Sequence, residues 1–177
     1  MTYLPAIIAI ALGAQLTHAQ VPLVSIDLLA GVAAHSTSAG VYRSDPVPTV
    51  RLAGEVRLWS RGNTRPVLKV EVEPRPCCTG STGAPGPYPF PRPGGVSYAL
   101  GVSYLGNSGL VLGVAVGGGR YGGEYRGTRH NSVFGEAELG WNGLPHTAFM
   151  ANVQYRQWSA SGTRFWFAPT TVGVRVF

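Results

Sequence analysis

Period-two alternation of apolar and charged residues is the feature that most limits how this chain can fold. In residues 49–59, Val50 and Leu52 share one parity, whereas Arg51 and Glu55 share the other. Successive side chains of a strand point to opposite faces, whereas helical spacing fits none of this pattern. The alternation recurs in eight segments, which predict eight strands over residues 23–34, 49–59, 67–73, 96–105, 110–118, 132–141, 147–158 and 165–177.

The gaps between these segments alternate in length. Gaps after the first, third, fifth and seventh segments are long, with the seventh the weakest case, and gaps after the second, fourth and sixth are short. A barrel that crosses a membrane with both termini on one side has short periplasmic turns and long outer loops. The short gap at Asn142-Gly143 also has the residues that favour a tight hairpin. The pattern predicts an all-β, eight-stranded, antiparallel, up-and-down transmembrane barrel.

The charged residues of the predicted strands all lie on the less apolar parity. A closed ring is the only way for strands to satisfy their backbone groups in hydrocarbon, and one Lys or Arg on the lipid side costs roughly 2–4 kcal/mol at mid-depth. We therefore expect these residues inside the barrel: Asp27, Arg51, Glu55, Arg57, Lys69, Glu71, Glu73, Glu136, Glu138, Arg156 and Arg175.

The interior predicted in this way holds five cations and six acids, a net charge of 5 − 6 = −1. Eight strands enclose a space just wide enough for side chains to fill, and buried charges need partners. We expect an ion-paired core without an open pore, and the alternative is a narrow channel lined with charges. The polar residues expected to complete its hydrogen bonds are Ser25, Ser97, Ser103, Asn152 and Gln154.

Aromatic residues near the strand ends predict girdles at the two membrane interfaces. The outer girdle is expected to hold Tyr98, Tyr155, Phe165, Trp166 and Phe167, and the inner girdle Tyr104, Trp141, Phe149 and Phe177. In a soluble β-sandwich the same residues would form a core and would not need to cluster at strand ends.

The first 19 residues predict a secretory signal peptide. They contain an apolar run without charges, and the small-residue pattern Thr17-His18-Ala19 follows it. The alternative, a retained anchor, needs roughly 20 apolar residues. The mature domain is then residues 20–177.

These features together resemble the small OmpA/OmpX-type outer-membrane β-barrels of Gram-negative bacteria. The resemblance implies a bacterial outer-membrane location, and it implies that Phe177 belongs to the signal recognised by the barrel-assembly machinery. That family has apolar residues two and four places before its final Phe, where this chain has Arg175 and Gly173. Either Phe177 turns outward beyond the last strand pair, or the match to the assembly signal is imperfect.

The predicted outer loops are basic. A plausible partner is lipopolysaccharide, because arginine forks bind phosphate well, and the alternative is a solvated rim without a ligand. Nucleic acid is a poor partner, since hardly any Lys accompanies the Arg and no binding motif occurs. The candidate contacts are Arg43, Arg120, Arg126, Arg129 and Arg164.

Residues 74–95 are rich in Pro and Gly and predict an irregular external loop. The loop contains the only cysteines, Cys77 and Cys78, which are adjacent. They form a strained vicinal disulfide, crosslink two chains or stay unpaired, and two neighbouring thiols are too few for a metal site. Flanked by Pro66 and Pro74, the third predicted strand is shorter than the roughly 9–11 residues that a spanning strand needs.

We expect a non-enzymatic monomer without a cofactor, acting in envelope structure or surface interaction. One alternative is a lipid-modifying barrel enzyme, because His130 and Ser132 near Glu136 superficially resemble the His-x-Ser arrangement of lipid A deacylases. The spacing departs from that family, whose acid lies where this chain has Leu144. The other alternative is a secreted, soluble, lipocalin-like barrel.

Overall fold

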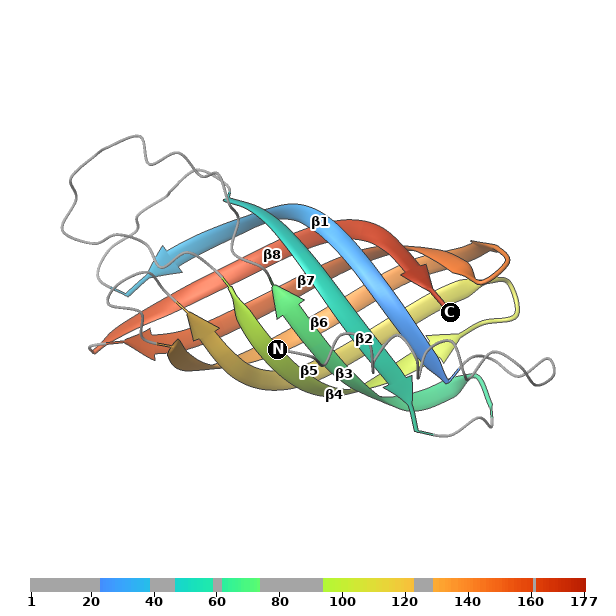
Figure 1. Ribbon diagram of the computed structural model, residues 1–177, viewed down its shortest axis with the longest axis horizontal. Helices are drawn as coiled ribbons and strands as arrows, with labels where there is room; N and C mark the ends of the chain where they lie inside the picture. Colours follow the sequence, from blue (N-terminus) through green and yellow to red (C-terminus); the bar gives the residue numbers. More distant parts are fainter. Residues whose placement is uncertain (1–22, 39–46, 59–61, 74–93, 123–128, 161) are drawn as a thin grey trace, which may run out of the picture.

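Eight antiparallel strands close into a single barrel in the computed structural model, which describes residues 23–38, 47–58, 62–73, 94–122, 129–160 and 162–177 (Figure 1). Each strand pairs with its neighbours in the chain, and β1 also pairs with β8. The predicted fold class is confirmed. The strands are β1 (Val24–Thr37), β2 (Val47–Arg57), β3 (Thr64–Glu73), β4 (Gly95–Leu105), β5 (Leu110–Gly122), β6 (Arg129–Leu144), β7 (Thr147–Ala160) and β8 (Thr163–Val176).

The strand registers fix the stagger of the barrel. Following paired residues once around the ring from Asp27 leads back to β1 at Thr37, ten residues further along. The path passes through Ala53, Glu71, Ser97, Gly119, Ser132, Trp158 and Phe165. Such a stagger requires strands that tilt steeply against the barrel axis, as Figure 1 shows.

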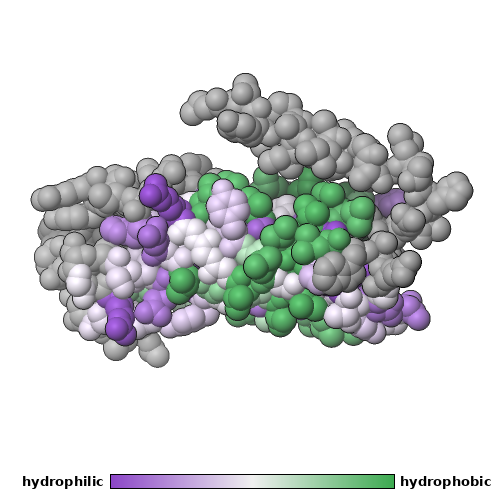
Figure 2. All heavy atoms as spheres, turned by 90° about the horizontal axis from the view of Figure 1, so that it is seen from below, coloured by the Kyte–Doolittle hydropathy of each residue, from purple (hydrophilic) through white to green (hydrophobic). Residues whose placement is uncertain are grey.

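The two faces of each strand differ in polarity as the alternation predicts. Outward side chains are large and apolar, and Leu100, Val114, Val116 and Val172 are each at least 60% exposed. Inward positions carry the charges. Figure 2 shows the outward residues as a hydrophobic band across the barrel, with hydrophilic residues toward both ends.

The ends of the barrel differ in their connections. β1 begins and β8 ends at one end, here called the turn end, which also holds the β2–β3, β4–β5 and β6–β7 turns. The opposite loop end holds the other four connections. The β7–β8 connection, which the sequence predicts to be long, contains only residues 161 and 162, so the alternation in length fails there.

Strand β3 is longer than predicted. It begins at Thr64 and continues through Pro66, whose carbonyl oxygen accepts a hydrogen bond from the backbone N–H of Leu58. The paired register with β2 ends one residue beyond the proline, at the Arg57–Val67 pair. Because Pro66 lies at the end of this ladder, its missing N–H costs little.

The predicted signal peptide over residues 1–19 lies outside the described residues. So does the predicted loop 74–95, apart from Gly94 and from Gly95, which begins β4. Among the residues that are described, no helix is long and apolar enough to cross a membrane.

Candidate functional site

The interior of the barrel holds every acid of the described residues and six cations. The eleven charged residues expected inside are all buried there, with exposed fractions from 0% for Arg175 to 8% for Glu138. Arg65 is also buried. It lies before the predicted third strand, residues 67–73, but β3 begins at Thr64 and so includes it. Six cations and six acids balance, so the expected net charge of −1 is wrong.

Asp27 and Arg175 form an ion pair across the seam that closes the barrel. They are register partners on β1 and β8. The Arg175 guanidinium binds the Asp27 carboxylate through two N–O contacts of 2.6 and 2.7 Å. The same guanidinium lies 2.9 Å from Glu138 and 3.3 Å from Glu55. One cation on β8 therefore joins acids from three other strands.

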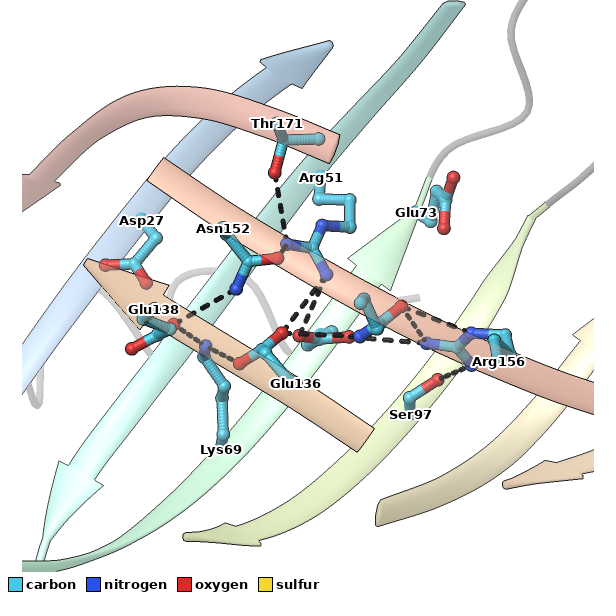
Figure 3. Close-up of polar contacts among 12 residues, drawn as sticks. Asp27, Arg51, Lys69, Glu73, Ser97, Glu136, Glu138, Asn152, Arg156 and Thr171 are labelled. Carbon is cyan, nitrogen blue, oxygen red and sulfur yellow. Dashed lines mark hydrogen bonds and ion pairs between the residues drawn. The ribbon is translucent and has the colours of Figure 1, made fainter. Parts of the chain in front are cut away.

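Lys69 and Arg51 link the two acids of β6 to the rest of the core (Figure 3). The Lys69 ammonium donates to both Glu136 and Glu138. Arg51 lies 3.2 Å from Glu136 and 3.4 Å from Glu71. Glu136 thus receives two cations, which offset its burial.

Amide and hydroxyl groups complete this part of the network. The Arg51 guanidinium donates to Asn152 and, at 3.2 Å, to the Thr171 hydroxyl. Gln154 donates to Glu71 at 3.0 Å and to Glu136 at 3.3 Å. Thr171 is a contributor that the sequence analysis missed, although its parity matches that of Arg175.

Arg156 is held by both polar and aromatic groups. It donates to Ser97 at 2.6 Å and to Ser132 at 3.2 Å, and it lies 3.4 Å from Glu71. Its guanidinium carbon is 4.4 Å from the centre of the Tyr121 ring and 4.5 Å from that of Phe134. Cation–π contacts are strongest where the cation is removed from water, which suits this buried position.

Aromatic side chains close the interior at the loop end. Trp158 stacks on Phe165 with ring centres 5.5 Å apart, and Tyr121 and Phe167 pack beside them. The hydroxyl groups of Tyr121 and Thr49 both donate to the Glu73 carboxylate. In Figure 3, Glu73 lies apart from the ion pairs of the core. Phe165 and Phe167 belong to this cap rather than to the outer girdle, so their predicted place is wrong.

Phe177 closes the interior at the turn end. It is buried against Leu29, Val111 and Met150, and the Arg57 guanidinium carbon lies 5.2 Å from the centre of its ring. It shares parity with Arg175 and therefore faces inward. Phe177 does not turn outward, and its predicted place in the inner girdle is wrong. Trp141 and Phe149, by contrast, do face outward.

Small residues on β5 make room for these side chains. A Cβ atom at Gly113 would lie 2.8 Å from a Glu138 oxygen, and one at Gly117 would lie 2.8 Å from the Phe134 ring and 2.3 Å from the Tyr98 carbonyl oxygen. Gly117 and Gly119 are thus strand residues facing the core. Glycine is required at these positions because large side chains of the adjacent strand β6 fill the space beside them.

The arginines proposed for ligand contact are only partly described. Arg120 and Arg164 are exposed at the loop end, and Arg129 is the first residue of β6. Arg43, Arg126, Cys77 and Cys78 lie outside the described residues. Because the interior charges cancel, the net charge of +6 comes from the remaining charged residues of the chain.

Ser132, the candidate nucleophile of the enzyme alternative, contacts a backbone carbonyl and a guanidinium among the described residues. Its hydroxyl donates to the Gly119 carbonyl oxygen at 3.4 Å and accepts from Arg156. A guanidinium cannot take the proton of a nucleophile. Within the described part of the chain, no group of three or more His, Cys, Asp or Glu side chains is placed to hold a metal ion.

The barrel is similar to solved structures of two bacterial proteins and of a designed barrel. Neisserial surface protein A shares 15% identity with it, over 86% of this chain and 96% of that one, with a TM-score of 0.53. The attachment invasion locus protein Ail of Yersinia pestis shares 12% over 85% and 97%, with a score of 0.41. A designed transmembrane β-barrel shares 14% over 89% and 97%, with a score of 0.39. No protein-family model and no curated protein matches the chain.

The polarity of the barrel is the reverse of that of a water-soluble protein. Its charges are inside and its large apolar side chains are outside, an arrangement that only hydrocarbon stabilises. The likeness to Neisserial surface protein A independently supports the barrel fold. The chain is a closed eight-stranded β-barrel with the fold of Neisserial surface protein A, and its apolar belt is suited to hydrocarbon.

Proposed function

We propose that the protein is a non-enzymatic, monomeric barrel that acts in envelope structure or surface interaction. The filled interior is the observation that carries this proposal. Ion pairs connect six of the eight strands, namely β1, β2, β3, β6, β7 and β8, and aromatic residues cover them at the loop end. This arrangement favours a closed interior over a water path for ions. The contacts of the Ser132 hydroxyl are with the Gly119 carbonyl oxygen and the Arg156 guanidinium, neither of which acts as a base.

Conductance separates this proposal from a charge-lined channel. Purified barrel inserted into a planar lipid bilayer should show no single-channel steps above those of bilayer without protein. A variant with Arg156→Ser and Tyr121→Ala, which opens the loop-end cap, is the positive comparison. Regular steps in the unaltered protein would establish a channel instead.

We further propose that the basic loop end contacts lipopolysaccharide. The supporting observation is that the excess positive charge is not used in the core, and that Arg120 and Arg164 face solvent. The double variant Arg120→Ser/Arg164→Ser should bind lipopolysaccharide vesicles more weakly in flotation, whereas Gln157→Ser should not change binding. Equal binding by all three proteins would support a solvated rim.

A lipid-modifying role is the weaker alternative. Cells expressing the protein and cells expressing Ser132→Ala should give the same lipid A mass spectrum. A modification present only with the unaltered protein would restore the enzyme hypothesis.

The role of Phe177 in assembly remains a proposal that rests on the resemblance. The unfolded strand presents Phe177 before the ring has an interior, so an inward final position is compatible with recognition. Phe177→Ala should slow assembly in cells more than it slows refolding into vesicles. Equal slowing in both would assign Phe177 to packing alone.

A further inference from the structure

The lipid-facing surface contains a hollow of about 700 Å³ on the outer side of β6, β7 and β8. This hollow, here called the β7 hollow, has an apolar lining. Its volume falls within the range of ligand pockets, roughly 300–1,000 Å³. The residues that form its walls and floor are Leu139, Trp141, Phe149, Ala151, Val172 and Val174.

The strand register explains why the surface is hollow here. Ala151 on β7 lies between Leu139 on β6 and Val172 on β8, so a small side chain stands between two large ones. The next row, Gly140, Met150 and Gly173, has inward parity and adds nothing outside. The walls are therefore paired strands, and the hollow is built into the sheet.

The hollow reaches the membrane interface at the turn end. Of the two outward rows that line the hollow, the one nearer the turns holds Phe149 between Trp141 and Val174. The Trp141 indole N–H donates to the carbonyl oxygen of Ser108 in the β4–β5 turn at 3.3 Å. Tryptophan at such a level anchors in the headgroup region, so the hollow opens toward headgroups and runs from there into hydrocarbon.

We propose that the β7 hollow binds one straight acyl chain of a phospholipid in the periplasmic leaflet. The proposal rests on the membrane placement and goes beyond the proposed function. Short turns of such barrels face the periplasm, and an apolar hollow at that level meets acyl chains. Dispersion contacts with the walls favour a chain that fills it over lipid that leaves gaps.

A second copy of the barrel fits the hollow less well. A two-fold symmetric contact centred on β7 would set Ala151 against Ala151 and leave a void between the copies. A contact that inserted a ridge of one copy into the hollow of the next would be head-to-tail and would not close into a dimer. Geometry therefore favours the acyl chain.

Tryptophan quenching by brominated lipid tests the proposal. A background of Trp59→Phe/Trp166→Phe leaves Trp141 at the hollow and Trp158 in the interior. Vesicles of a phospholipid with methyl-branched chains receive increasing amounts of one with a straight, brominated chain. We expect Trp141 quenching to show a preference for the straight chain of about threefold, because only a few dispersion contacts of small individual energy distinguish the two chains.

Two variants identify the site. Ala151→Phe fills the hollow and should reduce the preference to random contact, and Ala151→Leu should reduce it in part. Val70→Phe adds the same ring on β3, across the barrel, and should leave the preference unchanged. Random quenching of the background protein, or an undiminished preference in both Ala151 variants, would overturn the proposal.

Counting the subunits in the same vesicles tests whether a second copy of the barrel occupies the hollow instead. A dimer that Ala151→Phe dissociates would assign the hollow to a second copy and would also overturn the proposal. Heat-dependent migration on a gel reports insertion separately. A correctly inserted barrel without a preference therefore refutes the acyl site and leaves the outer-membrane assignment intact.

Discussion

Strands β3 and β5 share the same kind of outer face and have opposite inner faces. Outward, β3 presents Val70 and β5 presents Val114, each among other large apolar residues. Inward, β3 carries Lys69 and Glu71, whereas β5 carries Gly113 and Gly117. The lipid sets the outer face of every strand alike, because each meets the same solvent. The inner faces share one small interior, and the glycines of β5 leave room there for Glu138 and Phe134, which enter it from the neighbouring strand β6.

The largest effect should come from the inner face of β3. Lys69→Met removes the cation shared by Glu136 and Glu138 and leaves buried acids short of a partner. We expect a loss of about 3–5 kcal/mol in the free energy of unfolding, measured by urea unfolding in lipid vesicles. Arg164→Met, exposed at the loop end, is the control and should change stability by under about 0.5 kcal/mol. A loss below about 1 kcal/mol for Lys69→Met would show that the network is not needed for stability.

The outer faces should respond alike. Val70→Lys on β3 and Val114→Lys on β5 each place an ammonium in hydrocarbon, at a cost of about 2–4 kcal/mol near mid-depth. The same unfolding assay should give two similar losses. A loss confined to one strand would mean that the other faces water or protein at that level, which would contradict a continuous belt.

The inner face of β5 should respond to bulk rather than to charge. Gly117→Val places methyl groups against the Tyr98 carbonyl oxygen and the Phe134 ring, and overpacking of this kind costs about 1–3 kcal/mol. Gly135→Ala on β6, where nothing lies within 4 Å of the added atom, should be neutral or slightly stabilising. Equal effects of the two substitutions would contradict the argument that the residues of β5 are small because large side chains of β6 fill the space beside them.

The smallest effect concerns the aromatic contacts of Arg156. Phe134→Leu keeps an apolar side chain but removes one ring from the guanidinium, with an expected loss of about 1 kcal/mol. Near-ultraviolet circular dichroism and unfolding should report it together. Phe134→Tyr, which keeps a ring, should retain more stability than Phe134→Leu, and the reverse order would assign the loss to packing.

The sequence predicts the sorting of side chains well, because lipid and core impose opposite preferences at alternate positions. Arg65 shows where this fails. It has the parity of Lys69, which could have placed it inside, but Pro66 suggests that the strand has not begun. Phe165, Phe167 and Phe177 likewise share parity with inward residues, yet an aromatic near a strand end equally suits a membrane interface. Parity decides these cases only once the strand bounds are known.

The partners within the core could not be predicted from the sequence. Arg51 meets Asn152 and Thr171 because of the stagger around the whole ring, and no single strand contains that information. The β7 hollow is hidden for the same reason. From the sequence alone, Ala151 is an ordinary outward residue. Its place between larger side chains appears only when its register partners on β6 and β8 are known.

The salt bridge between Asp27 and Arg175 at the β1–β8 seam restricts the register in which the last strand can pair with the first. A closure shifted by two residues would keep every side chain on its proper face, so lipid exclusion alone could not reject it. It would, however, set Asp27 opposite Gly173 or Phe177 and would leave the buried Asp27 carboxylate without the Arg175 guanidinium as its register partner. A shift by one residue is already excluded, because it would place the Arg175 side chain in the hydrocarbon of the membrane. The ion pairs of Arg175 therefore distinguish the native closure from one shifted by two residues, which the sorting of side chains between lipid and interior cannot do.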